Sequence, residues 1–219
     1  MIIRKTNDQL NLMRLSGKIV AETLLLIEEK VRPGITTAEL DRIAEEFIIK
    51  SGAKPSFKGL YGFPASLCIS VNEQVVHGIP GGYVLKDGDI ISVDCGALLN
   101  GYHGDAARTF GVGAISPEAN KLIEVTRDSF FKGIEYAKVG NRLSDISHAI
   151  QNYVEASGFS VVKDFVGHGI GRQLHEEPNV PNYGLPNKGP KLDVGMTLAI
   201  EPIVNMGKAS VMTLKDKWT

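Results

Sequence analysis

The residues with the clearest capacity for chemistry lie in the stretch 167–178, which reads GHGIGRQLHEEP. Its two histidines, His168 and His175, lie seven residues apart, and glycines alternate with other residues around the first of them. Alternate glycines let the backbone approach its neighbours closely or take positive φ angles, so both imidazoles could project from an open frame into a site. The simpler alternative is a glycine-rich strand end with surface histidines, followed by an acidic helix or loop start.

Two common motifs with similar residues do not fit this stretch. Its glycines follow G-x-G-x-G instead of G-x-G-x-x-G, and no acidic residue follows a strand at the required spacing, so a dinucleotide loop is not predicted. The HEEP sequence lacks the second histidine of H-E-x-x-H, and Pro178 would stop the helix that this motif needs. A zincin is therefore excluded.

Three carboxylates stand where burial is expected. Asp94 follows the apolar run 90–93, Glu201 lies inside the apolar run 198–204, and Asp105 comes close enough after Asp94 to reach back to the same point. A buried carboxylate is costly unless it is paired, protonated or bound to a metal. With His168 the three acids make a hard, oxygen-rich ligand set, which suits Mn, Fe, Co or Zn better than a thiolate site would. For any one acid alone, an N-cap or a surface salt bridge is the simpler interpretation.

The elements that must position these residues are helices followed by strands. Apolar spacing predicts a helix over 7–30, ended by Pro33 and Gly34, and Thr36 with Glu39 forms a capping box for a second helix that stops at Gly52. Composition then predicts strands at 67–71, 90–95 and 108–112, with a turn at 87–88. Ser116 and Pro117 restart helical patterning as N-cap and first helical residue.

The second half of the chain repeats the pattern of the first. Gly34 to Gly52 and Gly140 to Gly158 both span eighteen residues. The sequence LKDG at 85–88, followed by Asp94, matches LDVG at 192–195, followed by Glu201. This repeat predicts two α+β halves related by a pseudo-two-fold axis, which would bring Asp94 and Glu201 near one another. Coincidence among common helix-stop glycines is the alternative.

Composition excludes several classes of protein. The chain has 219 residues and a net charge of −1, and its basic residues are scattered, so no nucleic-acid patch and no polybasic membrane patch are predicted. No signal-peptide core and no apolar run of about 18 residues occur, which favours a soluble, unsecreted protein. Two cysteines, Cys68 and Cys95, fit buried thiols in a reducing compartment better than a disulfide framework.

As an ordered set, the motifs resemble those of the type I methionine aminopeptidases of the bacterial kind. The matching segments are VHGIP at 76–80, SVDCG at 92–96, GDAART at 104–109, GHGIGR with HEEP at 167–178, and IEP at 200–202. The resemblance implies the pita-bread fold, in which two α+β halves, about 1–113 and 114–219, surround a central antiparallel sheet in one catalytic domain, 1–219. It also implies metal-dependent hydrolysis of the initiator methionine from nascent proteins and peptides with a small second residue.

Roles carry over onto the matching residues. Asp94, Asp105, His168 and Glu201 resemble the metal ligands, with Asp105 bridging two ions; the family uses two divalent ions, Co, Mn, Fe, Ni or Zn. Glu201 would shuttle a proton to the leaving amine, His175 would hydrogen-bond the carbonyl oxygen, and His77 would contact the peptide backbone. The residues at the places of the methionine pocket are Cys68, Phe63, Leu174 and Trp218. For Cys68, a small core residue is an equally good interpretation.

The resemblance also carries expectations about setting and leaves alternatives. It implies a cytoplasmic monomer that acts on nascent chains, near the ribosome. The metal-binding pattern alone is shared with prolidases and proline-specific aminopeptidases, so a proline-specific dipeptidase on the same fold is one alternative. A pita-bread protein that has lost catalysis and binds a partner is another.

This sequence departs from the family at its last residues. Family members continue past the tryptophan that matches Trp218 into further strands of the sheet, which carry a last glutamate that bridges both metals. On this basis we expect an incomplete second metal site, lower activity than a longer form, and an exposed sheet edge that permits self-association.

Overall fold

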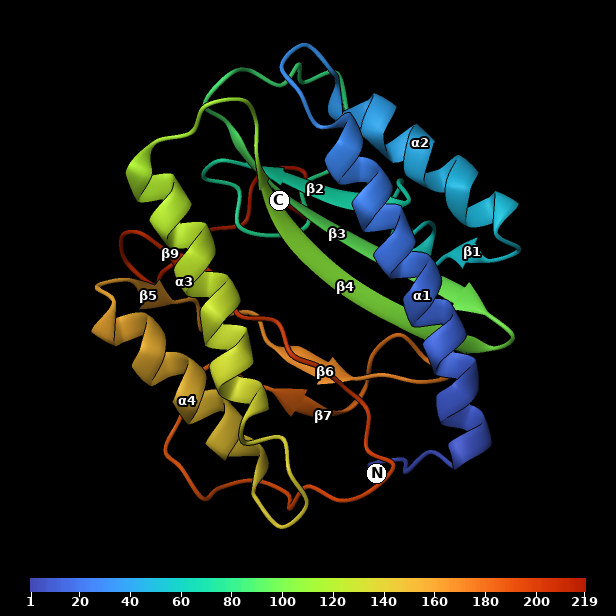
Figure 1. The fold of residues 1–219 in the computed structure, drawn as a ribbon, viewed down its shortest axis with the longest axis vertical. Coiled ribbons are helices and arrows are strands. Elements are labelled where there is room, and N and C mark those ends of the chain that lie inside the picture. The colour runs from blue at the N-terminus through green and yellow to red at the C-terminus, as the bar shows by residue number, and fades with distance from the viewer. The chain divides into compact units, whose positions relative to one another are not determined.

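A computed structural model describes residues 1–219, and the chain divides into two compact units (Figure 1). The first, here called the N-terminal unit, comprises Asp8–Pro117, Gly171–Leu174 and Thr213–Thr219. The second, here called the C-terminal unit, comprises Met1–Asn7, Glu118–Ile170 and His175–Met212. All strand pairs are antiparallel, and each unit combines helices with sheets, so the predicted α+β class is confirmed.

The N-terminal unit is built on a four-stranded sheet (Figure 1). Strand β3 pairs with β4 along its whole length on one side and with β1 and β2 on the other. Two helices, α1 and α2, lie against this sheet. The elements are α1 (Asn7–Lys30), α2 (Thr37–Lys50), β1 (Lys54–Pro55), the 3-10 turn η1 (Leu60–Gly62), β2 (Leu67–Val71), β3 (Ile90–Leu99) and β4 (Tyr102–Gly111).

The strands predicted at 90–95 and 108–112 belong to one hairpin of two ten-residue strands: β3 continues to Leu99, and β4 already begins at Tyr102. Residues 101–105 were assigned to no element from the sequence, yet from Tyr102 onward they pair with β3. Gly104 serves packing here: a Cβ at this position would lie 2.6 Å from the backbone nitrogen of Gly17 in α1. The missed signal is the Asn100 and Gly101 pair, whose positive φ angles close the hairpin.

Sequence signals at the helix ends of this unit are confirmed. The Thr36 hydroxyl accepts a hydrogen bond from Glu39 N at 3.1 Å, and the Glu39 carboxylate accepts one from Thr36 N at 2.9 Å. This is the predicted capping box, and it sets the start of α2 at Thr37. Gly52, with a φ of 79°, follows the end of the helix and turns the chain toward β1.

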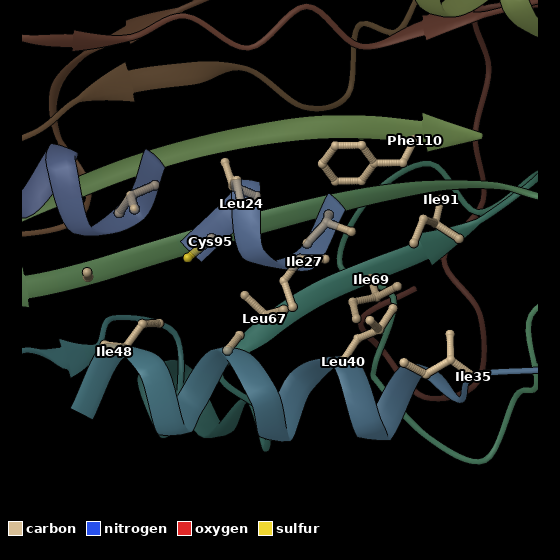
Figure 2. Close-up of a cluster of buried hydrophobic side chains, with 14 of the residues drawn as sticks. Leu24, Ile27, Ile35, Leu40, Ile48, Leu67, Ile69, Ile91, Cys95 and Phe110 are labelled. Atoms are coloured by element: carbon tan, nitrogen blue, oxygen red, sulfur yellow. The ribbon is translucent and has the colours of Figure 1, made fainter. Parts of the chain in front are cut away.

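The core of the N-terminal unit lies between the two helices and one face of the sheet (Figure 2). Strand residues alternate between faces, so every second residue of β2 and β3 is apolar and points toward the helices. Buried residues of this cluster include Leu24, Ile27, Leu40, Ile48, Leu67, Ile69, Ile91, Cys95 and Phe110. The opposite face of the same sheet carries polar residues of these strands, among them Ser70, Ser92 and Asp94.

The C-terminal unit has two helices and two small sheets. Its elements are α3 (Pro117–Ile134), α4 (Leu143–Ala156), β5 (Ser160–Val161), β6 (Gly167–Gly169), β7 (Glu176–Val180), β8 (Leu198–Ala199) and β9 (Val204–Asn205). The helix predicted to restart at Ser116 and Pro117 is α3, which confirms that start. Strand β6 is central between β7 and β8, and β5 pairs with β9. None of the helices of the chain is both long and apolar enough to cross a membrane.

The sequence repeat corresponds to repeated local contacts. Gly34 N donates a hydrogen bond to Leu85 O at 2.8 Å, and Gly140 N donates one to Leu192 O at 3.2 Å. Both glycines have similar positive φ angles, 91° and 96°. Helices α2 and α4 each have 14 residues, and each begins with an acidic residue at its third position that caps the backbone. The matching sequences thus form the same local structure in each unit.

Candidate metal centre

The β3–β4 hairpin presents two acidic side chains on one face of its sheet. Asp94 pairs with Ala107, and Asp105 pairs with Gly96, so the two aspartates are diagonal neighbours across the ladder. Paired residues share a face and so do residues two apart on one strand, which places both carboxylates on the side away from the core. Both are half-buried. Asp105 therefore lies beside Asp94, as its place in the sequence led us to expect.

Cys68 shares this acidic face. It pairs with Asp94 across β2 and β3, and its side chain is buried. Cys95 points to the opposite face and belongs to the apolar core, whereas Cys68 does not. Burial, together with the nearby carboxylates of Asp94 and Asp105, raises the pKa of the Cys68 thiol far above its usual value. Cys68 is thus a buried, neutral thiol on the acidic face, outside the apolar cluster that contains Cys95.

Three of the residues expected to contact substrate form one aromatic cluster in the N-terminal unit. The rings of Phe63 and Trp218 meet edge to face, with centroids 5.0 Å apart. The ring of His77 meets Trp218 in the same way at 6.4 Å. Leu174 is buried in the segment 171–174, which a hydrogen bond from His103 N to Gly171 O holds to β4 at 2.8 Å.

The backbone around His77 is held in an unusual conformation. His77 has a φ of 57°, which is uncommon for a residue with a side chain. Gly78 follows, and a Cβ there would lie 2.2 Å from Ile69 O, so only glycine fits against β2. Its amide donates to the Ser70 hydroxyl at 3.1 Å, and its carbonyl accepts from Ile69 N at 2.8 Å. Burial lowers the pKa of His77, so the imidazole is neutral near pH 7.

In the C-terminal unit, His168 lies on β6 between two glycines that permit close strand packing. A Cβ on Gly167 would lie 2.2 Å from Ala199 O, and a Cβ on Gly169 would lie 2.2 Å from Glu177 O. The glycines therefore serve close approach of the backbones on both sides of β6 and not a positive φ. The residues after His175 form strand β7, so the alternative of an acidic helix or loop start is wrong.

The His168 ring is oriented by a backbone carbonyl. Its Nδ1 lies 2.7 Å from Gly169 O, and because a carbonyl only accepts, Nδ1 carries the proton. The other ring nitrogen, Nε2, lies 3.1 Å from Glu201 Oε1. A proton or a cation between Nε2 and the carboxylate oxygen would hold these two atoms at this distance. Hydrogen bonding of the remote nitrogen to a carbonyl is also the usual arrangement of a histidine that binds a metal.

The apolar flanks of Glu201 predicted one continuous strand. In the structure, Glu201 instead lies between two short strands, β8 and β9. Pro202 has no N–H to donate to a strand ladder, which explains the interruption between β8 and β9. The exposed His175 completes this group, since its ring packs edge to face on His168 with centroids 4.5 Å apart. The structure thus brings His168, His175 and Glu201 together.

The position of Glu201 also depends on Asn182, a residue that the sequence gave no reason to single out. Asn182 is completely buried, and its Nδ2 donates to the backbone carbonyl of Glu201 at 2.6 Å. It follows β7 directly after Pro181. A buried amide in an otherwise ordinary PNY sequence carries no motif, so only the structure could show its role in orienting Glu201.

Comparison with known proteins assigns the family. The model of metallopeptidase family M24 matches residues 11–217. The chain belongs to metallopeptidase family M24. Among M24 relatives, it is 71% identical to the methionine aminopeptidase of Clostridium perfringens and 61% identical to methionine aminopeptidase 1 of Bacillus subtilis. Each alignment covers 100% of this chain and 88% of the relative.

A solved structure gives the same result for the M24 fold. The crystal structure of methionine aminopeptidase from Rickettsia prowazekii superposes with a TM-score of 0.98 at 41% identity, over 100% of this chain and 88% of that chain. The fold and family expected from the sequence motifs are therefore confirmed. Membership of M24 implies the use of a divalent metal ion. Within the N-terminal unit the hairpin carboxylates, and within the C-terminal unit the His168–Glu201 pair, are donor types that suit divalent ions.

Proposed function

We propose that this chain hydrolyses the N-terminal methionine from peptides and nascent proteins that have a small second residue. The observation that carries the proposal is its similarity, along its full length, to enzymes named methionine aminopeptidases. The side chains described above supply the chemistry that such a reaction needs.

The metal ligands in this proposal are Asp94, Asp105, His168 and Glu201, and they would hold two divalent ions, each Co, Mn, Fe, Ni or Zn. Asp105, His168 and Glu201 offer two carboxylates and an imidazole, donor types that these ions prefer. Bound metal would supply a water of lowered pKa and would polarise the scissile carbonyl. The carbonyl of Gly169 leaves Nε2 of His168 as the nitrogen that binds.

The remaining polar groups act on protons and on the peptide. Glu201 carries the proton toward the leaving amine. His175 donates a hydrogen bond to the carbonyl oxygen as negative charge develops on it, an interaction that counts most in the transition state. His77, kept neutral by burial, donates to or accepts from the backbone of the substrate. Each role follows from the residue type and from its match to the family motifs.

The methionine side chain would enter an apolar pocket formed by Phe63, Trp218, Cys68 and Leu174. Phe63 and Trp218 already pack together, and aromatic rings make favourable contacts with a thioether sulfur. The neutral thiol of Cys68 adds a small, polarisable wall and introduces no charge. Leu174 is buried and apolar. Together these residues favour an unbranched, sulfur-containing side chain.

The substrate sets the proposed location and partners. Nascent chains carry the initiator methionine, so we place the protein in the cytoplasm, acting as a monomer close to the ribosome.

The experiment that tests the proposed function measures methionine release by metal-stripped protein titrated with Co or Mn. Met-Ala-Ser is the substrate, Met-Trp-Ser tests the requirement for a small second residue, and Ala-Pro-Ser tests the proline-specific alternative. We expect metal-dependent release from Met-Ala-Ser, with much slower cleavage of the other two. Cleavage of Ala-Pro-Ser alone would replace the proposal with a proline-specific activity. Metal uptake without cleavage of any peptide would indicate a binding protein.

A further inference from the structure

Lys5 and Glu176 form a buried ion pair in the C-terminal unit, and the proposed reaction makes no use of it. Lys5 Nζ lies 2.6 Å from Glu176 Oε2, although 171 residues separate the two in sequence. Their side chains are only 3% and 5% exposed. Burying a charged group is costly, because the group loses its hydration. The location of this pair, next to His175, suggests a function for it.

The N-terminal arm, residues 3–5, fixes the lysine end of the pair. Lys5 N donates to Gly195 O at 2.7 Å, and Lys5 Nζ also donates to Ile3 O at 3.2 Å. Gly195 has a φ of 84°, and a Cβ there would lie 2.5 Å from Lys5 O, so the arm sits tightly on this turn. The ammonium group is therefore held by the backbone on its own side and acts as a fixed point for its partner.

The glutamate end of the pair adjoins the proposed oxyanion donor. Glu176 is the first residue of β7, pairs with Gly169 of β6, and directly follows His175. Consecutive residues at a strand point to opposite sides, so an inward Glu176 directs His175 outward. This agrees with the burial of Glu176 and the exposure of His175, whose ring packs on His168.

We propose that Lys5 and Glu176 are positioning residues for His175: the buried ion pair fixes the backbone at the start of β7 and so sets where the His175 imidazole points. The inference rests on the proposed function, because it assigns the pair a task in that reaction. Neither residue touches the substrate. A misplacement of about 1 Å at a catalytic group can reduce the rate about 100-fold, so a rigid anchor one residue away is valuable.

The test measures kcat and KM for Met-Ala-Ser with Lys5→Met at a fixed, saturating metal concentration, well below the melting temperature. We expect kcat to fall about 10- to 100-fold with KM within about twofold, because the oxyanion contact forms mainly in the transition state. The matched control breaks the exposed ion pair of the same arm with Arg4→Gln and Asp193→Asn. This control should leave kcat unchanged. An unchanged kcat in Lys5→Met would overturn the inference.

A double-mutant cycle separates positioning from general support of the fold. In a His175→Ala background, Lys5→Met should lower kcat by less than about twofold, since the group that it positions is gone. If the full loss persists there, the pair acts on the structure in general and the inference is wrong.

Should Lys5→Met fail to fold, Lys5→Met with Glu176→Leu removes both charges together, and the same cycle applies to that variant. Inactive wild-type protein would refute the proposed function and this inference with it, whereas active wild-type protein with fully active variants refutes the inference alone.

Discussion

The two units position their candidate ligands in different ways. In the N-terminal unit, Asp94 and Asp105 lie on a hairpin in which ten consecutive residue pairs form an uninterrupted ladder. In the C-terminal unit, His168 lies on the three-residue strand β6, between the five-residue β7 and the two-residue β8. A long ladder fixes side chains by register alone. A short one cannot, so the placement of His168, His175 and Glu201 depends on added contacts.

Those added contacts are specific and few. Gly167 and Gly169 let three backbones pack closely, Asn182 holds the main chain of Glu201, and the Lys5–Glu176 pair fixes the start of β7. The comparison therefore predicts that single substitutions away from the ligands damage the C-terminal part of the candidate site more than the hairpin.

The largest effect is expected for Gly169→Ala. Its Cβ would lie 2.2 Å from the backbone oxygen of Glu177, and a backbone atom cannot move without separating β6 from β7. We expect the free energy of unfolding to fall by about 3 kcal/mol or more, which urea denaturation would measure. Gly207→Ala is the matched control in the same unit, since nothing lies within 4 Å of its Cβ position. Equal stability of the two variants would show that β6 tolerates wider strand spacing.

A smaller effect is expected for Asn182→Leu, which keeps the branching of the side chain and removes the donor to Glu201 O. Loss of a group that orients a ligand commonly lowers metal affinity about 10-fold or more, and calorimetric titration with Mn would detect this. On the hairpin, Ser92→Ala removes the hydrogen bond to Thr109 at 2.8 Å, yet the ladder remains. Its metal affinity should match that of the wild type. A larger loss in Ser92→Ala than in Asn182→Leu would reverse the comparison.

The smallest effect is expected on the pH dependence of the free energy of unfolding, through His77. Burial lowers the pKa of the His77 imidazole in the folded state, so the unfolded chain binds the proton more readily. The contribution of His77 to the free energy of unfolding is therefore complete above about pH 6.5. It is lost as the pH falls through the lowered pKa that His77 has in the folded state. His77→Asn, with a residue that tolerates the positive φ, should remove this part of the decline between pH 7.5 and 5.5. Identical pH profiles of unfolding would contradict the assignment.

Much of this could be predicted from sequence because the signals are local. The capping box at Thr36 and Glu39, the start of α3 at Pro117 and the acidic residue after the run 90–93 each depend on neighbouring residues. The repeat of Gly34 in Gly140 was visible because it preserves both spacing and residue type. Ordered motifs were specific enough to identify the family.

What the sequence could not provide depends on contacts between distant residues. Lys5 and Glu176 each look like ordinary surface charges, and only folding brings them together. Gly104 carried no strand signal in the sequence, and only its close contact with Gly17 shows why the strand needs glycine there. Asn182 has no partner within its own segment to reveal its role. Such groups act through tertiary packing, which no local pattern encodes.

The central claim is that the hairpin carboxylates and the His168–Glu201 pair both take part in the proposed metal-dependent release of methionine. The most direct measurement compares Mn-dependent methionine release from Met-Ala-Ser by wild type, Asp105→Asn and His168→Gln, with Ser92→Ala as the folded control. Loss of a metal ligand should reduce kcat/KM at least about 100-fold in both ligand variants, a loss of about 2.7 kcal/mol in transition-state stabilisation, and leave the control unchanged. Full activity in either ligand variant, with its fold intact, would contradict the account.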